Sequence, residues 1–497
     1  LALAILSNFY IGYMTCFFLA VYFFIRYATL TPEERNPRMI RHAFWKTLLR
    51  MLLFSLLAVM IASVIILPVY YSLSFGKLEF SEPKYEAKQL FDWLEMLTKA
   101  FFGSYDSVRP TGMPFLYCGT LMPLLLPLYF LTPHIPLRKK IGSLVTLAFL
   151  FVSFNFSILD IIWHGFQRPN WLNARFAFMF VFFAVLFTYD AFRYLRETGV
   201  RRIGVTAMLS VVLLLVMQAM GYKNVDDFLT VWVGIFFIAA YAVCVPFAMR
   251  RSEEDPVSLY NNRELLLVML IVFETVLNGV AMTYSLDADV SFTSRRSYRH
   301  FVDKYSAASA MVQSLDTQKY GADSFYRVEK TSHRKKNDNF AIDVNGLSNS
   351  TSTLNAKTIS FLHNIGLSAR SHWSMYYGGT PVSDAIFDVR YLIVDRMTND
   401  YVPAYVNTLY SHIADSSLPG SENDALEIYE SPFPLGIAFG TDSAIRDYAE
   451  YDAEEEKKRE DAGTATIASR YANAVEYHTP FAMMNHMLSA MLGEEIE

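Results

Sequence analysis

Charged residues are scarce in this chain of 497 residues: Asp, Glu, Lys and Arg make up 18%, against 53% hydrophobic residues. No polybasic tail is present, which argues against a nucleic-acid partner. The three cysteines have no metal-ligand spacing and lie in or beside apolar segments, as small buried residues do. The sequence also lacks a phosphate-binding glycine-rich loop and the HExxH, CxxC and GxSxG motifs. The sequence therefore shows no motif for an ATP-driven enzyme or transporter. No cofactor is identified, and metal dependence stays open.

Long hydrophobic runs fill the first part of the chain and end near residue 285. About 20 apolar residues cross the hydrocarbon core of a bilayer, and a lone span must be helical because lipid offers its backbone no hydrogen bonds. About eight such spans are predicted, at residues 1–26, 50–73, 115–132, 141–159, 176–192, 203–220, 229–249 and 265–284.

The distribution of Lys and Arg predicts the orientation of these spans. The links 26–50, 132–140, 193–202 and 250–264 carry sixteen of them, whereas the opposite links carry eight. Basic links stay on the cytoplasmic side. The rule therefore places links 74–114, 160–175 and 221–228 outside, together with everything after residue 284.

The composition changes at Leu286, where Ser, Asp, Asn, Thr and Gly become frequent. Residues 323–330, 391–395 and 426–439 are typical of strands, and 353–365 of a helix. The charge run 451–462 favours a solvated helix. The predicted fold is thus mainly α: a polytopic transmembrane helical bundle in residues 1–285, followed by a soluble, mixed α/β extracytoplasmic domain in residues 286–497.

The link between the fourth and fifth predicted spans concentrates polar and aromatic residues. It contains Trp163, His164, Arg168, Trp171 and Arg175. One interpretation is an interfacial anchor, because Trp and Arg favour the headgroup level. The other is an anion site at the membrane surface, because the guanidinium fork matches a phosphate group.

The outer link 74–114 contains a second candidate group. Residues 86–102 have helical periodicity and are expected to lie along the membrane surface. The turn-rich segment GSYDSVRPTGMP follows, in which Tyr105, Asp106 and Arg109 supply an acceptor and two donors. A simple local ion pair between Asp106 and Arg109 is the alternative.

Two further polar groups lie in predicted spans. Asn8, Tyr10 and Tyr13 near the outer end of the first span fit an aromatic belt or a cavity lining. Glu274 and Asn278 in the eighth span are four residues apart and so share one helix face. A carboxyl group at that depth is either functional or a neutral, hydrogen-bonded packing residue.

Six segments carry a resemblance to a known family: SNFYIGYM, FGSYDSVRPTGMPFLYCG, HGFQRPNWLNARFAF, FYRVEKT, NSTSTLN and HWSMYYGGTPVSDAIFDVRYLIV. In this order, between residue 7 and about residue 440, they resemble the bacterial YfhO family of polytopic membrane proteins. The resemblance implies a multi-pass protein of the bacterial cell membrane. It also implies a fragment, lacking earlier spans, a first outer loop and the C-terminal end.

The resemblance further implies a glycosyltransferase of the GT-C type. Such an enzyme takes a sugar from a polyprenyl-phosphate carrier at the outer face and transfers it to an envelope glycopolymer such as lipoteichoic acid. Under this hypothesis Arg175, Arg168 and Arg109 bind the leaving phosphate, with His164 as a partner. Asp106 is the visible candidate base, although the missing first loop is the expected source. Trp163, Trp171 and Tyr105 would stack on the sugar or hold the carrier.

Two other classes of function stay open. A transporter or flippase for a lipid-linked sugar would use the same arginines, with Glu274 as a coupling group. A scaffold for envelope assembly would instead bind its partners through the soluble domain, where residues 372–384 form an aromatic, glycine-rich loop.

Overall fold

The computed structural model describes residues 1–30, 40–74, 85–105, 108, 112–167, 169, 171–195, 199–225, 227–249, 257–290, 292–370, 372–398, 402–446, 479–494 and 496. The chain divides into two compact units, Leu1–Leu67 with Ser81–Phe292, and Pro68–Phe80 with Thr293–Glu497. The first unit is helical and the second contains small sheets between helices, which confirms the predicted fold class.

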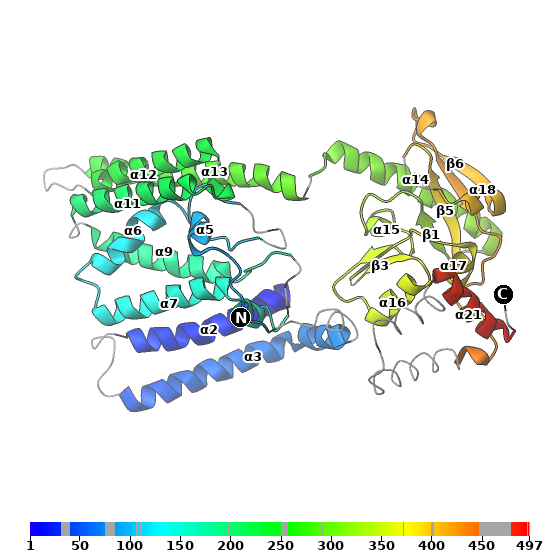
Figure 1. Cartoon of the computed structure of the whole chain (residues 1–497), viewed down its shortest axis with the longest axis horizontal. Helices are drawn as coiled ribbons and strands as arrows, with labels where there is room; N and C mark the ends of the chain where they lie inside the picture. Colours follow the sequence, from blue (N-terminus) through cyan, green and yellow to red (C-terminus); the bar gives the residue numbers. More distant parts are fainter. Residues whose placement is uncertain are drawn as a thin grey trace. The chain divides into compact units, whose positions relative to one another are not determined.

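The first unit is a bundle of helices that run alongside one another (Figure 1). Its described elements are α1 (Ala2–Ser7), α2 (Phe9–Thr29), α3 (Ile40–Ser74) as far as Leu67, α5 (Trp93–Thr98), α6 (Leu121–Leu131), α7 (Leu137–Asn155), α8 (Ser157–Trp163), α9 (Ala177–Arg193), α11 (Val200–Ala219), η1 (Lys223–Val225), α12 (Phe228–Met249) and α13 (Val257–Val290). Helix α6 packs on α9, α11 and α12, and α7 packs on α2, α8 and α9.

Five helices in the described residues are long and apolar enough to cross a membrane. They are Phe9–Thr29, Phe44–Ser74, Val200–Ala219, Phe228–Met249 and Asn262–Asp287. Helices α6, α7 and α9 coincide with three other predicted spans. However, α6 and α9 have only 11 and 17 residues, and three basic residues occupy the first turn of α7. The five long apolar helices make the chain a multi-pass membrane protein. The count of eight spans stays a prediction.

The first predicted span, residues 1–26, is two helices in the structure. Asn8 separates them, because its side-chain oxygen accepts hydrogen bonds from the backbone N–H groups of Tyr10 and Ile11, each at 3.1 Å, and so begins α2. Helix α1 folds back closely on α2, and a Cβ at Gly12 would lie 2.7 Å from the Cα of Ile5. Gly12 is required for this approach.

The prediction of a surface helix over residues 86–102 is also wrong in extent. Only α5 is helical, and it begins at Trp93 because the Asp92 carboxylate caps the N–H groups of Leu94 and Glu95. The residues before it pair instead with the end of α7. The buried Asn155 side chain accepts from the backbone N–H groups of Leu90 and Phe91 at 3.1 and 2.6 Å. Periodicity alone did not reveal this tertiary contact.

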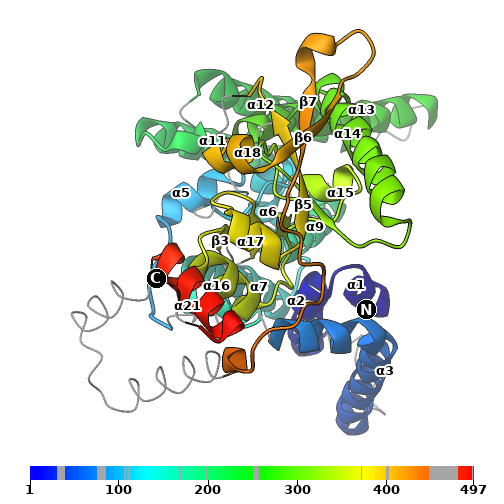
Figure 2. The same ribbon diagram turned by 90° about the vertical axis from the view of Figure 1, so that its right-hand side faces the viewer.

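The second unit is built on a four-stranded sheet with the order β1-β5-β7-β6, of which Figure 2 labels β5, β6 and β7. Its strands are β1 (Arg327–Lys330), β5 (Val389–Asp395), β6 (Ser411–Ser416) and β7 (Leu426–Glu430), and β1 and β5 are parallel. Every residue of β5 is buried. Leu392 and Val394 enter one core, whereas Tyr391 and Ile393 enter the other, on the opposite face of the sheet.

Helices and a second sheet cover the faces of this sheet. Helix α14 (Arg295–Tyr320) packs on β6 and β7, and α17 (Pro381–Ile386) packs on β5. The second sheet has the order β2-β4-β3, formed by β2 (Asn349–Ser350), β3 (Ser368–Arg370) and β4 (Trp373–Met375), and α16 (Ala356–Asn364) packs on it. The remaining described elements are α15 (Asp338–Ala341), α18 (Ala404–Leu409), η2 (Glu422–Asp424) and α21 (Pro480–Leu492).

The strands and the helix predicted for this unit agree with β1, β5, β7 and α16, although β7 ends at Glu430 rather than 439. The predicted helix at 451–462 lies outside the described residues. The proposed division at 285/286 falls inside α13, which continues to Val290.

Candidate functional site

The link between α8 and α9 is held in an unusual backbone conformation. Leu172 and Ala174 have φ angles of 56° and 50°, in the left-handed region that non-glycine residues seldom adopt. Such residues cost of the order of 1–3 kcal/mol each and are concentrated at binding sites. The Leu172 N–H donates to the Val108 carbonyl at 3.3 Å, so this link is joined to the loop that precedes α6.

The Arg175 side chain is positioned by this link. Its Nε donates to the Leu172 carbonyl at 3.1 Å and its Nη2 to the Trp171 carbonyl at 3.0 Å. The guanidinium carbon lies 4.9 Å from the centre of the Tyr10 ring, a distance typical of a cation–π contact. All three contacts are to uncharged groups. These contacts fix the direction of the guanidinium but do not neutralise its positive charge. The guanidinium also has further N–H donors.

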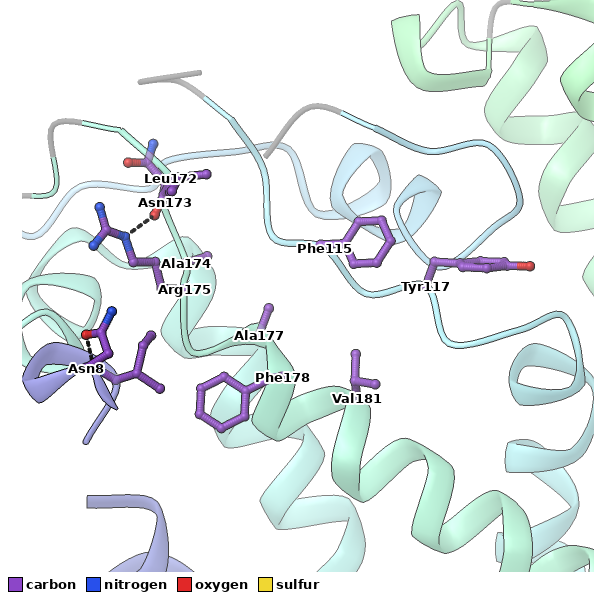
Figure 3. Close-up of a pocket in the computed structure, with 11 residues that line it drawn as sticks. Asn8, Phe115, Tyr117, Leu172, Asn173, Ala174, Arg175, Ala177, Phe178 and Val181 are labelled. Carbon is purple, nitrogen blue, oxygen red and sulfur yellow. Dashed lines mark hydrogen bonds between the residues drawn. The ribbon is translucent and has the colours of Figure 1, made fainter. Parts of the chain in front are cut away.

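Arg175 lines a cavity of about 490 Å³, here called the Arg175 cavity. Figure 3 shows that its walls come from separate parts of the chain: Asn8 at the start of α2, Asn173 and Arg175 in the link, Phe178 in α9, and Phe115 and Tyr117 before α6. The polar groups are few and the rest of the lining is mostly apolar. This arrangement suits an amphipathic molecule with an anionic group.

His164 is fully buried beside this region. Its Nδ1 lies 2.7 Å from the Asp160 carbonyl and 3.1 Å from the Asp160 carboxylate, so Nδ1 carries the hydrogen. The ring contacts Tyr10 and Phe176, each with 5.9 Å between centres. Among the described residues Nε2 has no hydrogen-bond partner. His164 therefore occupies a fixed position close to the Tyr10 ring that Arg175 covers.

The two tryptophans of the link differ in their surroundings. Trp163 is 1% exposed and stacks on Phe176 at 4.8 Å between ring centres, so it is part of the core. Trp171 is 51% exposed, and Tyr105 is partly buried. Composition does not separate these environments. Sugar stacking by any of the three residues stays a prediction.

Asp106, Arg109 and Arg168 lie outside the described residues, so their proposed roles stay predictions. Within the described part of the chain, no group of three or more His, Cys, Asp and Glu side chains is arranged to hold a metal ion.

Of the first-span residues interpreted as an aromatic belt or a cavity lining, Asn8 lines the Arg175 cavity and Tyr10 contacts Arg175. The sequence reasoning missed the opposite wall, formed by Phe115 and Tyr117 of the segment FLYCG. Two signals marked this segment: it ends the family-like stretch FGSYDSVRPTGMPFLYCG, and it places an aromatic pair with period two directly before an apolar run.

Glu274 of α13 is 2% exposed and is held by several donors. Its Oε1 accepts from the Tyr117 hydroxyl at 2.6 Å, from the Thr120 N–H at 2.8 Å and from the Thr120 hydroxyl. Its Oε2 accepts from the Tyr241 hydroxyl at 2.6 Å. One turn further along, the Asn278 side-chain oxygen accepts from the Gly103 N–H at 3.0 Å. The two residues therefore hold both ends of the loop that contains Phe115.

A family model described as "Bacterial membrane protein YfhO" matches residues 1–474. No curated protein and no solved structure matches the chain.

Proposed function

The chain belongs to the YfhO family of bacterial membrane proteins, and on this premise we propose that it is a membrane glycosyltransferase. It moves a sugar from a polyprenyl-phosphate carrier to an envelope glycopolymer such as lipoteichoic acid. The reaction takes place at the outer face of the membrane, on which side the second unit also lies. The observation that carries the proposal is the positioned, positively charged Arg175 in a largely apolar cavity.

The reaction requires a cationic group near the leaving phosphate. An acceptor hydroxyl attacks the anomeric carbon, the bond from that carbon to the phosphate oxygen breaks, and its electron pair stays on the phosphate. A base takes the proton of the hydroxyl. Arg175 is suited to the developing phosphate charge because its direction is fixed before the reaction begins. Asp106 remains a candidate for the base beside the first outer loop that the family resemblance implies, and Arg168 and Arg109 are the proposed additional donors.

The apolar walls support a lipid-linked donor over a free nucleotide sugar. Phe115, Phe178 and Val181 surround the cavity without offering hydrogen bonds from their side chains. A lipid whose aliphatic chain lies beside its phosphate matches such a lining, because burial of each CH₂ group contributes about 0.8 kcal/mol to binding.

Arg175→Ala tests the assignment. The wild-type protein and the variant, purified and supplied with a polyprenyl-phosphate sugar and candidate acceptors, are followed for release of bare polyprenyl phosphate and for labelling of the acceptor. Removal of one such donor typically lowers the rate by about 10²–10³. Arg193→Ala, at the other end of α9, is the matched control and should keep wild-type turnover. Normal turnover of Arg175→Ala would show that the phosphate assignment is wrong.

Two further measurements separate the other classes. A flippase moves the carrier across vesicle membranes without releasing bare polyprenyl phosphate. A scaffold is insensitive to Arg168 and Arg175 substitutions, but loses partner binding when residues 372–384 are changed.

A further inference from the structure

A second cavity shares a wall with the Arg175 cavity. It has a volume of about 390 Å³ and is lined by Glu274, Asn278 and Gly279 of α13, Tyr241 of α12, and Cys118 and Gly119, among others. We call it the Glu274 cavity. Phe115 and Tyr117 line both cavities, so the two cavities are direct neighbours.

The Glu274 carboxylate has an acceptor position left on one oxygen. Among the described residues, Oε1 receives three hydrogen bonds and Oε2 receives one, from the Tyr241 hydroxyl. A carboxylate oxygen has two lone pairs, so Oε2 can accept another hydrogen. Gly119 leaves room beside it, because a Cβ there would lie 3.9 Å from Oε2.

The chemistry of this cavity differs from that of the Arg175 cavity. The buried Glu274 carboxylate repels a phosphate group, and the groups that contact it are hydrogen-bond donors. A divalent cation would need several oxygen ligands, but the Asn278 oxygen is already occupied by the Gly103 N–H. A neutral ring with hydroxyl groups meets both features of the lining: its hydroxyl donates to Oε2, and its C–H face rests on an aromatic side chain.

We propose that the Glu274 cavity binds the sugar of the lipid-linked donor, while the Arg175 cavity binds its phosphate. This inference rests on the proposed function. The phosphate and the sugar are directly bonded in such a donor, and the two cavities are directly adjacent across Phe115 and Tyr117. Glu274 is then a residue that binds substrate, and Tyr117 separates the two subsites while its hydroxyl holds the carboxylate in place.

The test compares two lipids on the purified protein in nanodiscs: polyprenyl phosphate and the same lipid carrying a hexose. Competition binding gives a Kd for each. A hydrogen bond to a charged group contributes about 1.5–3 kcal/mol, so Glu274→Gln should weaken binding of the hexose-bearing lipid by about 10- to 100-fold. It should leave binding of bare polyprenyl phosphate unchanged. Glu264→Gln, an exposed residue on the same helix, is the matched control and should change neither Kd.

Gly279→Leu provides a second test in case Glu274→Gln destabilises the protein. A Cβ at Gly279 meets nothing within 4 Å, and Leu has a higher helix propensity than Gly. The larger side chain should enter the Glu274 cavity and again weaken only the hexose-bearing lipid.

The outcomes distinguish the two proposals. If both lipids bind wild type in a manner that depends on Arg175, but both variants affect the two lipids equally or not at all, the sugar subsite is refuted and the proposed function stands. If neither lipid binds wild type, the proposed function itself fails.

Discussion

Replacing Arg390 tests how the second unit is held together. Arg390 lies in the central strand β5 and is 7% exposed. Its guanidinium donates to the Asp316 carboxylate of α14 at 2.8 Å, to the Ser324 hydroxyl at 2.8 Å and to the Asp388 carboxylate at 3.4 Å. It also covers the Tyr320 ring at 4.5 Å. One side chain thus joins β5 to the helix that follows the membrane span α13.

The expected cost follows from what the substitution leaves behind. Asp316 is 1% exposed in the structure. In Arg390→Met its carboxylate should keep, among the described residues, only the hydrogen bond from the Tyr391 hydroxyl, at 3.0 Å. Breaking a buried ion pair by removing one partner costs about 3–5 kcal/mol. Domains are stable by only about 5–15 kcal/mol. The substitution should therefore remove a large part of the stability that holds α14 on the sheet.

Hydrogen exchange of the β5 amides in the full-length protein measures this loss as a free energy of opening. The control Arg296→Met changes an exposed residue of α14 and should have an effect within about 0.5 kcal/mol. The double variant Arg390→Met with Asp316→Leu should cost less than the sum of the single changes, by about 0.5–3 kcal/mol. Equal protection of β5 in Arg390→Met and in the control would refute the reasoning.

Three further predictions concern other residues. Burial raises the pKa of Asp384 to about 7 from its ordinary 3.8. The folded protein then keeps a proton that the unfolded chain releases, so the free energy of unfolding should fall as pH rises from about 4 to about 7. Hydrogen exchange of the α17 amides, measured at several pH values, should show a flatter dependence of this free energy on pH in Asp384→Asn. An unchanged dependence would mean that another group causes it. Trp163→Ala should lower the thermal midpoint of the purified protein strongly, since loss of a buried Trp costs about 3–5 kcal/mol, whereas Trp171→Ala should leave it near wild type; equal midpoints would contradict the difference in burial. Gly378→Ala should open the second sheet to proteolysis, because Gly378 has φ +84° and an added Cβ would collide with the Gly366 carbonyl; wild-type resistance would argue against this geometry.

Local patterns in the sequence predicted much of the fold. Long apolar runs indicated helices, because a chain in lipid must satisfy its own backbone hydrogen bonds. The run YLIVD predicted a strand, and burial on both faces of the sheet accounts for its continuous apolar character. Two predictions were wrong for different reasons. The distant Asn155 side chain binds the segment before α5, and the local Asn8 cap divides the first span.

The candidate site was predicted only in part. The sequence showed that Arg175 was charged at the mouth of an apolar segment, and that Glu274 and Asn278 shared a helix face. It did not show that the Trp171 and Leu172 carbonyls direct the guanidinium, because this depends on the left-handed backbone of the link.

The amino-acid sequence by itself determined the membrane class, the change to a mixed α/β unit and the family, because these depend on composition, periodicity and motif order along the chain. Only the tertiary structure decided which residues share a cavity. Asn8, Phe115 and Arg175 are far apart in the sequence, as are Tyr117, Tyr241 and Glu274. Packing of α2, α9, α12 and α13 brings them together. It also buries Trp163 while Trp171, eight positions later, stays half-exposed, because burial depends on neighbours supplied by other helices.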